Sequence, residues 1–415
     1  MQRRIVADYP LAFVALTLSF MGLAMVYSAG VTDVPTYVAG LYKSQLIWLG
    51  LGLFAAFTLT RTSVRFLSWM TWPVYVLSVL LLILTLVIGT GAGTAASTKS
   101  WLAIGGVRIG QPAELAKITV VLALAHVLAI RREAPRSLLD LWKPALVVGV
   151  PWVLIMAQPD LGTGIAFIGI FFAMLYWSGV AWPLLLLLAS PAISLILSFS
   201  TGLWGAWFLV LVALVLWYKP YLVEGIVLMV ANVATGVLAP IMWERLKPYQ
   251  QNRLRVFLNP EFDPRAAGYQ VIQSKVAIGS GGLFGKGYTD GSQKRLAFLP
   301  AQHTDFIWAV MGEELGFIGV TIGLALFTAL LLRAIRISVR ANDSFASLVG
   351  FGLMASWLTH VLVNIGMTLN LLPITGIPLP FFSYGGSFML ASWLAVGMLL
   401  RISGEGRGKA GGLLG

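Results

Sequence analysis

The residues of this sequence best suited to chemistry are acids that stand beside long apolar stretches. The segment QHTDFIWAVMGEELGF (302–317) places four titratable side chains at the start of an apolar run: His303, Asp305, Glu313 and Glu314. Charge is costly where such a run crosses a bilayer, so these residues are candidates for a functional site. Asp305 can serve as a general base. Glu313 lies about two helical turns deeper and requires a buried Lys or Arg as its partner.

Three other segments bring polar groups to the ends of apolar runs. In GQPAELAK, Glu114 and Lys117 are three residues apart, share one helical face and can pair. They form either a structural ion pair or the lining of a polar cavity. In QPDLGT, Asp160 either caps a helix or lines the same cavity, and it can do both. Ser383, in FFSYGGS, adds a hydroxyl beside a pair of glycines that allow close approach of another element.

Other candidate motifs are better explained as structural. The segment SGGLFGK resembles a phosphate-binding loop but lacks the required Gly and Ser or Thr positions, so its glycines indicate tight turns. His126 and His360 lie within apolar runs, and we expect each to be a buried, hydrogen-bonded, neutral side chain. Their spacing from other ligand residues does not form a zinc motif. The absence of cysteine excludes disulfides, thiolate metal sites and a cysteine nucleophile.

The elements that position these residues are membrane helices. The 415 residues are 58% hydrophobic and only 11% charged, against about 25% charged in soluble domains. Runs of about 20 apolar residues predict an all-α polytopic membrane protein with about twelve spans. These spans are expected near 11–30, 44–60, 70–90, 114–131, 141–157, 162–179, 182–199, 203–218, 222–243, 306–333, 346–370 and 378–402. We expect residues 1–403 to form one transmembrane domain, followed by a disordered cytoplasmic tail at 404–415.

The distribution of Lys and Arg predicts the orientation. With twelve spans, the basic residues of the short loops fall on one side together with both termini, and that side is therefore cytoplasmic. The formal net charge of +12 is partly this topology signal. It does not indicate nucleic-acid binding, because no aromatic-rich basic module is present.

One long segment, residues 244–305, lies on the opposite, extracytoplasmic side. It carries nine Lys or Arg residues and enough apolar residues to form short helices on the outer face. A basic outer surface beside membrane lipids favours an anionic ligand such as a phosphate-bearing lipid, with Lys275 as a candidate contact. Simple attraction to anionic headgroups is the alternative.

Five motifs together carry a resemblance to a known family. GQPAELAK, QPDLGT, NPEFDPRAAGYQVIQSKVAIGSGG, FLPAQHTDFIWAVMGEELG and PITGIPLPFFSYGGS occur in this order over about 100–390. The combination resembles the SEDS family (shape, elongation, division, sporulation), and TGIPLPFFSYGGS is more similar to its elongation members than to its division members. The resemblance implies a peptidoglycan glycosyltransferase that polymerises lipid II on the outer face of the bacterial cytoplasmic membrane. It also implies release of undecaprenyl pyrophosphate and a class B penicillin-binding protein as partner.

The resemblance also implies roles for particular residues. Asp305 matches the catalytic aspartate of the family, and four further positions match polar residues that line its central cavity: Glu114, Lys117, Asp160 and Ser383. His303 and Lys275 complete the predicted substrate-binding set. Asp305 could instead, or also, hold Mg²⁺ or Mn²⁺. Family members commonly have ten spans, so we expect an extra helical hairpin near 180–220.

Two other functions remain open from the sequence. Twelve spans with buried charge also suit a transporter or lipid flippase, for which Glu313 and Glu314 would line a path through the bilayer. An accessory scaffold that only recruits the crosslinking partner is the third alternative. Within the enzyme hypothesis, a division-specific role competes with elongation.

Overall fold

The structure is a computed structural model in which the helices fall where the apolar runs predict them. It describes residues 8–33, 35–91, 100–104, 107–131, 133–246, 248–262, 267–299 and 301–410. One long helix lies in each predicted span. These helices are α1 (Tyr9–Ala29), α2 (Leu41–Thr60), α3 (Val64–Ile88), α4 (Pro112–Ala129), α5 (Trp142–Ala157), α6 (Leu161–Trp177), α7 (Trp182–Leu197), α8 (Thr201–Tyr218), α9 (Leu222–Arg245), α13 (Ile307–Val339), α14 (Ser344–Thr368) and α15 (Gly386–Ala410).

Fewer helices have the length and hydropathy of a membrane crossing than lie in the predicted spans. Among the described residues, nine helices are long and apolar enough to cross a membrane. α2 is not one of them, and α6 and α7 are apolar but only 17 and 16 residues long. The chain is therefore a multi-pass helical membrane protein, and about twelve spans stays a prediction.

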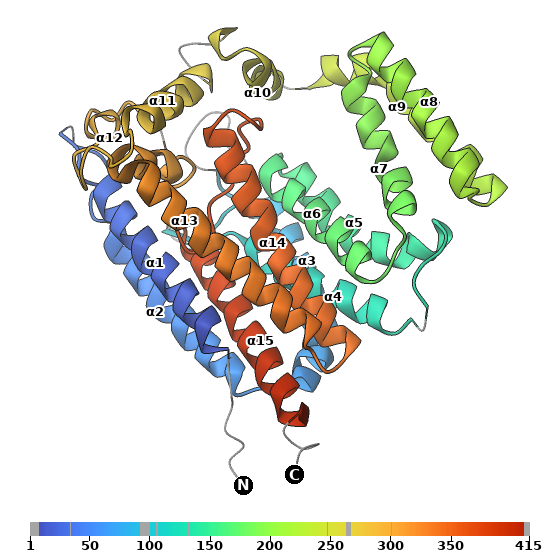
Figure 1. The fold of residues 1–415 in the computed structure, drawn as a ribbon, viewed down its shortest axis with the longest axis horizontal. Helices are drawn as coiled ribbons and strands as arrows, with labels where there is room; N and C mark the ends of the chain where they lie inside the picture. The colour runs from blue at the N-terminus through green and yellow to red at the C-terminus, as the bar shows by residue number, and fades with distance from the viewer. Residues whose placement is uncertain are drawn as a thin grey trace.

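The core of the bundle is built around α14. It packs against α4, α6 and α13, while α15 packs along α2 (Figure 1). Side chains along most of α4 and α14 are buried, which explains their weak amphipathicity: a helix surrounded by other helices needs no polar face. The first residues of α1 and the last residues of α15 lie at one end of the bundle (Figure 1).

The expected hairpin near 180–220 is present as α7 and α8. These two helices pack with α9 at the side of the bundle, around a small leucine cluster (Figure 1). A buried polar contact holds α9 to α7, since the Asn232 amide donates to Ser190 Oγ and its oxygen accepts from Ser194 Oγ.

The predicted outer segment forms short helices at the end of the bundle opposite the start of α1 (Figure 1). They are α10 (Pro248–Leu258), the 3-10 turn η2 (Pro260–Phe262), α11 (Ala267–Ser280) and α12 (Ser292–Arg295). Another 3-10 turn, η1 (Leu139–Leu141), precedes α5. The prediction of an all-α chain misses one small antiparallel hairpin before α4, formed by β1 (Leu102–Ile104) and β2 (Val107–Gly110).

The prediction of a disordered tail from residue 404 is wrong for residues 404–410. α15 continues to Ala410, and Glu405 ties the helix to the start of α3. The Glu405 carboxylate accepts hydrogen bonds from Arg401 (2.6 Å) and from the backbone N–H of Val64 at the start of α3. The composition of the tail, rich in glycine, hid this contact with a distant element. Residues 411–415 lie outside the described part of the chain.

Candidate functional site

Asp305 belongs to a turn that we call the Asp305 segment (residues 301–306), which leads directly into α13. Three hydrogen bonds from other elements fix its backbone. Ser383 Oγ donates to the carbonyl of Thr304 (2.7 Å), and Asn364 Nδ2 on α14 donates to the carbonyl of Asp305 (3.0 Å). The N–H of Tyr384 donates to the carbonyl of His303 (2.9 Å). The prediction that His303, Asp305 and Ser383 lie together is therefore consistent with the geometry.

The Asp305 carboxylate lies against a glycine of the α14–α15 connection (residues 369–385). Gly376 has φ +74°, and a Cβ placed on it would stand 3.3 Å from Asp305 Oδ2. The left-handed backbone and the close approach both favour glycine at this position. Gln45 on α2 braces the other end of the connection, where its side chain bonds the carbonyl of Ser383 and the N–H of Gly385.

A second polar group, the α4 cluster (Gln111, Glu114, Lys117 and Asp160), occupies the N-terminal end of α4. Lys117 Nζ lies 2.8 Å from Glu114 Oε2, and both side chains are almost completely buried. Asp160 caps α6 through the N–H of Thr163 and also accepts from Gln111 Nε2 (2.8 Å). The expectation that Asp160 caps a helix is therefore confirmed, and the same carboxylate also joins the α4 cluster.

His303 is 6% exposed, and its ring contacts Tyr37 and Tyr384 edge-on or tilted. Burial lowers its pKa from 6.5 to about 4, because desolvation disfavours the charged imidazolium. The side chain is therefore neutral at physiological pH, and its Nδ1 has no hydrogen-bond partner among the described residues.

Lys275 is placed differently from the other predicted site residues. It is exposed on α11, and its ammonium makes no hydrogen bond or ion pair with the described residues. The neighbouring Ser274 is buried and anchors α11 by donating to the carbonyl of Thr368 at the end of α14 (2.8 Å). The structure therefore does not bring Lys275 into contact with either polar group.

The glycine-rich segment 281–287 is a backbone support for α13. α13 is interrupted at Gly316, whose φ of +62° and ψ of −163° are not helical. The broken hydrogen bonds are replaced by the loop: Phe317 and Ile318 donate to the carbonyls of Gly282 and Leu283. In return, Lys286 and Gly287 donate to the carbonyls of Glu313 and Glu314. The interpretation of these glycines as turn formers is confirmed.

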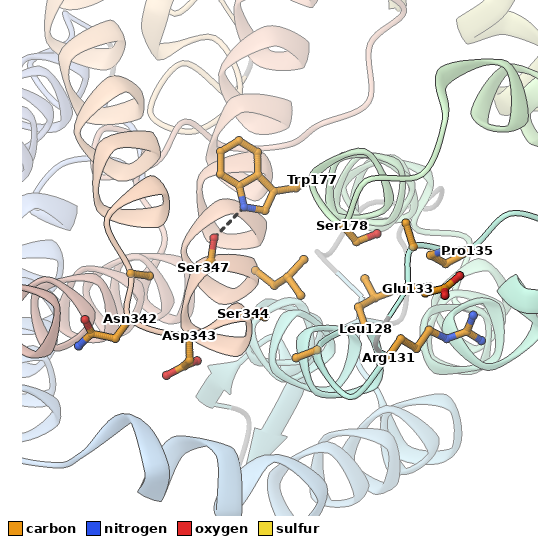
Figure 2. Close-up of a pocket in the computed structure, with 14 residues that line it drawn as sticks. Leu128, Arg131, Glu133, Pro135, Trp177, Ser178, Asn342, Asp343, Ser344 and Ser347 are labelled. Carbon is orange, nitrogen blue, oxygen red and sulfur yellow. Dashed lines mark hydrogen bonds between the residues drawn. The ribbon is translucent and has the colours of Figure 1, made fainter.

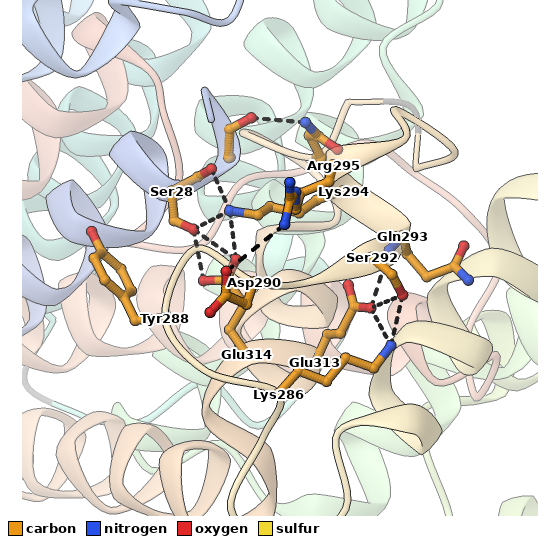
Figure 3. Close-up of polar contacts among 12 residues, drawn as sticks. Ser28, Lys286, Tyr288, Asp290, Ser292, Gln293, Lys294, Arg295, Glu313 and Glu314 are labelled. Atoms are coloured by element: carbon orange, nitrogen blue, oxygen red, sulfur yellow. Dashed lines mark hydrogen bonds and ion pairs between the residues drawn. The ribbon is translucent and has the colours of Figure 1, made fainter. Parts of the chain in front are cut away.

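The two acids of α13 are both paired with lysines of the outer segment (Figure 3). Glu313 Oε1 accepts from Lys286 Nζ (2.7 Å), so the expected basic partner is present, but Lys286 is exposed and only Glu313 is buried. Glu314 lies 2.6 Å from Lys294 Nζ, and Ser28 of α1 bonds both charged groups. These contacts fasten the outer segment to α1 and α13.

One cavity lies away from all of these groups, at the opposite end of α4. It has a volume of about 470 Å³ and is lined by the ends of α4, α6 and α13 and the start of α14 (Figure 2). Arg131, Glu133 and Asp343 supply its charge, and Trp177 donates to Ser347 Oγ across it. No residue of the predicted site lines this cavity.

Sequence reasoning missed the uncharged residues that hold the site, chiefly Gln45, Gln111 and Asn364. Each is an amide whose partners are backbone groups or side chains far away in the chain, so no local spacing reveals them. Their position within or beside apolar runs was the available signal, because a polar group buried there needs a partner. His360 is buried and hydrogen-bonded, as expected.

The fold and these groups together define a class of protein. It is a multi-pass helical membrane protein with buried ion pairs and with an aspartate, Asp305, whose backbone is held by hydrogen bonds from other elements. The profile of the cell cycle protein family that unites FtsW, RodA and SpoVE matches residues 9–207 and 204–408. The chain belongs to this family.

Named relatives match over nearly the full length. Peptidoglycan glycosyltransferase RodA of Treponema pallidum is 34% identical, with 95% of this chain and 97% of that protein covered. Peptidoglycan glycosyltransferase MrdB of Escherichia coli K12 is 34% identical (95% and 93% covered), and stage V sporulation protein E of Bacillus subtilis is 35% identical (95% and 96%).

Solved structures give the same result. A chain of a peptidoglycan synthase complex that coordinates polymerization and crosslinking superposes with a TM-score of 0.71 at 30% identity, covering 97% of this chain and 98% of that one. Thermus thermophilus RodA superposes with a TM-score of 0.62 at 28% identity, covering 96% and 97%.

Proposed function

We infer that this chain is a peptidoglycan glycosyltransferase that polymerises lipid II by inverting transfer. The observation that carries this function is the placement of Asp305. Its segment is held by α14 and by the α14–α15 connection, and α14 also contacts the buried Glu114–Lys117 pair through His360. The RodA and MrdB relatives are peptidoglycan glycosyltransferases, which supports the same reaction.

The reaction forms one bond and breaks one bond. The 4-hydroxyl of the acceptor sugar attacks the anomeric carbon of the donor, whose bond to undecaprenyl pyrophosphate breaks with inversion to a β-1,4 linkage. Asp305 takes the hydroxyl proton, and a positioned base of this kind contributes roughly 10²–10⁴ in rate. Positive charge near the departing diphosphate stabilises the developing negative charge. Lys117 is the buried cation of the α4 cluster, and Lys275 offers a further cation on the outer segment.

A divalent cation is compatible with this donor set only with help from the substrate. Among the described residues, no three His, Asp or Glu side chains are grouped to hold a metal ion. Mg²⁺ is commonly bound by one or two carboxylates together with phosphate oxygens. Asp305 and the diphosphate of lipid II would hold Mg²⁺ or Mn²⁺ in this way, and the ion would neutralise the leaving group. Loss of activity in EDTA that added Mg²⁺ or Mn²⁺ restores tests this proposal.

The cellular setting follows from the same reasoning. The basic short loops support an orientation with both termini in the cytoplasm, which puts Asp305 on the outer face of the bacterial cytoplasmic membrane. The similarity to a complex that couples polymerization to crosslinking supports a transpeptidase of the class B penicillin-binding proteins as partner. The motif TGIPLPFFSYGGS supports a role in elongation and cell shape rather than division.

A matched pair of variants tests the assignment of Asp305. The protein is reconstituted with its penicillin-binding partner and given lipid II, and glycan chains are resolved on gels. Asp305→Asn should lower the polymerisation rate by about 100-fold or more. Asp33→Asn is the control, because Asp33 is an exposed acid at the same end that pairs with Arg295. Full activity of Asp305→Asn would remove this residue from the chemistry.

The transport alternative gains no support from the contacts of its key acids. Glu313 and Glu314 form ion pairs with Lys286 and Lys294 beside the interruption of α13. This arrangement gives both acids a role in fastening the outer segment. We therefore favour the polymerase.

A further inference from the structure

Two buried residues on α14 connect the α4 cluster to the Asp305 segment. His360 and Asn364 are four residues apart, so they lie on the same face of the helix. Both side chains are fully buried, with no exposed surface. The polymerase mechanism above assigns neither of them a part.

The contacts of His360 fix its chemical form. Its Nδ1 lies 2.9 Å from the carbonyl of Pro378, which can only accept, so Nδ1 carries the proton. Its Nε2 lies 2.6 Å from Lys117 Nζ and therefore accepts from the ammonium. Both bonds exist only for the neutral Nδ1–H tautomer. The ring also stacks on Phe388, over which Lys117 Nζ lies at 5.0 Å.

Asn364 continues the connection from the carbonyl of Ile377, the residue before Pro378. Its Nδ2 donates one hydrogen bond to Ile377 O (2.7 Å) and the other to Asp305 O (3.0 Å). Both amide protons are therefore used to tie the α14–α15 connection to the Asp305 segment. Gly376, the preceding residue of that connection, leaves so little room that an added Cβ would stand 3.3 Å from Asp305 Oδ2.

We propose that His360 and Asn364 are positioning residues that couple the α4 cluster to Asp305 through residues 376–378. The inference rests on the proposed polymerase function. On the side of α4, Lys117 pairs with Glu114 and donates to His360, which donates in turn to the carbonyl of Pro378. On the side of Asp305, Asn364 donates both to the carbonyl of Ile377 and to the carbonyl of Asp305. The backbone between Ile377 and Pro378 joins the two sets of hydrogen bonds. Such a contiguous, buried network can hold two groups at a set separation, and displacement of a reacting group by about 1 Å can cost about 100-fold in rate.

Steady-state kinetics with lipid II distinguish positioning from simple stability. Asn364→Leu keeps the volume but removes both donors, and it should lower kcat by about 10- to 100-fold with KM changed by less than about twofold. Asn232→Leu is the matched control. Asn232 is also a fully buried helical asparagine, but its side-chain partners hold α9 to α7. The control should leave kcat unchanged at any similar loss of thermal stability.

His360 is tested by loss and rescue. His360→Phe keeps an aromatic ring against Phe388 but removes both hydrogen bonds. It should raise KM, because Lys117 loses the acceptor that positions its ammonium, and lower kcat, because the α14–α15 connection loses a donor. His360→Gln supplies one acceptor and one donor, and it should restore both constants to within about threefold of wild type. His126→Phe, at the other end of α4, controls for replacing a partly buried histidine with phenylalanine.

A double-mutant cycle between Lys117→Met and Asn364→Leu tests the coupling itself. These residues share no contact, so independent effects would add, whereas a connecting network makes the double variant less impaired than the sum of the single changes. Strict additivity, an equal fall of kcat in Asn364→Leu and Asn232→Leu, or no rescue by glutamine would each overturn the inference. Asp305→Asn is assayed in parallel: its full activity would reject the proposed base, whereas its inactivity beside an unaffected Asn364→Leu rejects only the positioning role.

Discussion

Removing the lysine of the Lys294–Glu314 pair should be among the most destabilising single changes in the outer segment. Both side chains are 0% exposed, and their charged atoms are 2.6 Å apart. Lys294 Nζ donates to Glu314, to Ser28 Oγ (2.5 Å) and to Ser28 O (2.7 Å), which uses all three protons of the ammonium (Figure 3). In Lys294→Met, the Glu314 carboxylate would remain buried with only the Ser28 hydroxyl as partner.

The magnitude follows from this burial. Breaking a buried pair by removing one partner costs about 3–5 kcal/mol, whereas removing both charges costs much less. We therefore expect Lys294→Met to lower the free energy of unfolding by about 3–5 kcal/mol, and the double variant Lys294→Met/Glu314→Gln to recover at least about half of the loss. The matched control is Arg136→Met. Its pair with Glu133 has side chains 83% and 75% exposed, so its loss should cost less than about 1 kcal/mol.

The assay is reversible unfolding in mixed micelles with increasing SDS, followed by tryptophan fluorescence. Lipid II polymerisation is measured on the same preparations, because the pair fastens the segment that leads to Asp305. Equal costs for Lys294→Met and Arg136→Met would refute the reasoning. So would a double variant that is less stable than Lys294→Met alone.

Three further outcomes follow from the site. Gly285→Ala should strongly destabilise the protein in the same unfolding assay, because φ is +79° and the new Cβ would stand 2.0 Å from the carbonyl of Glu314. The control is Gly279→Ala, which should leave the stability unchanged or raise it slightly, because its new Cβ would meet open space within a helix. Gly376→Ala should lower polymerisation more than stability, since its Cβ would press on the Asp305 carboxylate. His303, with its pKa lowered to about 4 by burial, contributes stability that is fully present above about pH 6.5 and is lost as the pH falls to about 4. The contribution is at most about 3 kcal/mol, and unfolding measured at pH 7 and 4.5 should show a weaker pH dependence for His303→Phe than for wild type.

The sequence predicted the parts of this fold that depend on local pattern. Apolar runs located every long helix, and the charge of residues 244–305 together with its apolar content predicted short helices there. Contacts between distant residues could not be predicted. Glu405 gave no sign that it would bond the start of α3, and the glycines of 281–287 gave no sign that they would support α13.

In the candidate site too, local pattern identified some residues, whereas residues that act through distant contacts were missed. Charged residues stand out in apolar surroundings, so Glu114, Lys117, Asp160 and Asp305 were found directly. Asn364 and Gln45 were not found, because an amide within an apolar run shows no spacing that identifies its partner. Lys275 was selected for its charge in a basic loop, but side-chain direction on α11 depends on how that helix packs, and Ser274 takes the buried position.

The interruption of α13 explains why the chain places two acids where charge is costly. A continuous helix would need no loop to satisfy its backbone, whereas the break at Gly316 requires residues 282–287 to supply donors and acceptors. Glu313 and Glu314 sit immediately before this break, and each binds a lysine from the same outer segment. The hydrogen bonds that satisfy the interrupted backbone of α13 and the ion pairs of Glu313 and Glu314 therefore both involve the outer segment. This loop leads through α12 to the Asp305 segment, so the position of Asp305 depends on the charges of Glu313 and Glu314 on α13 as well as on α14.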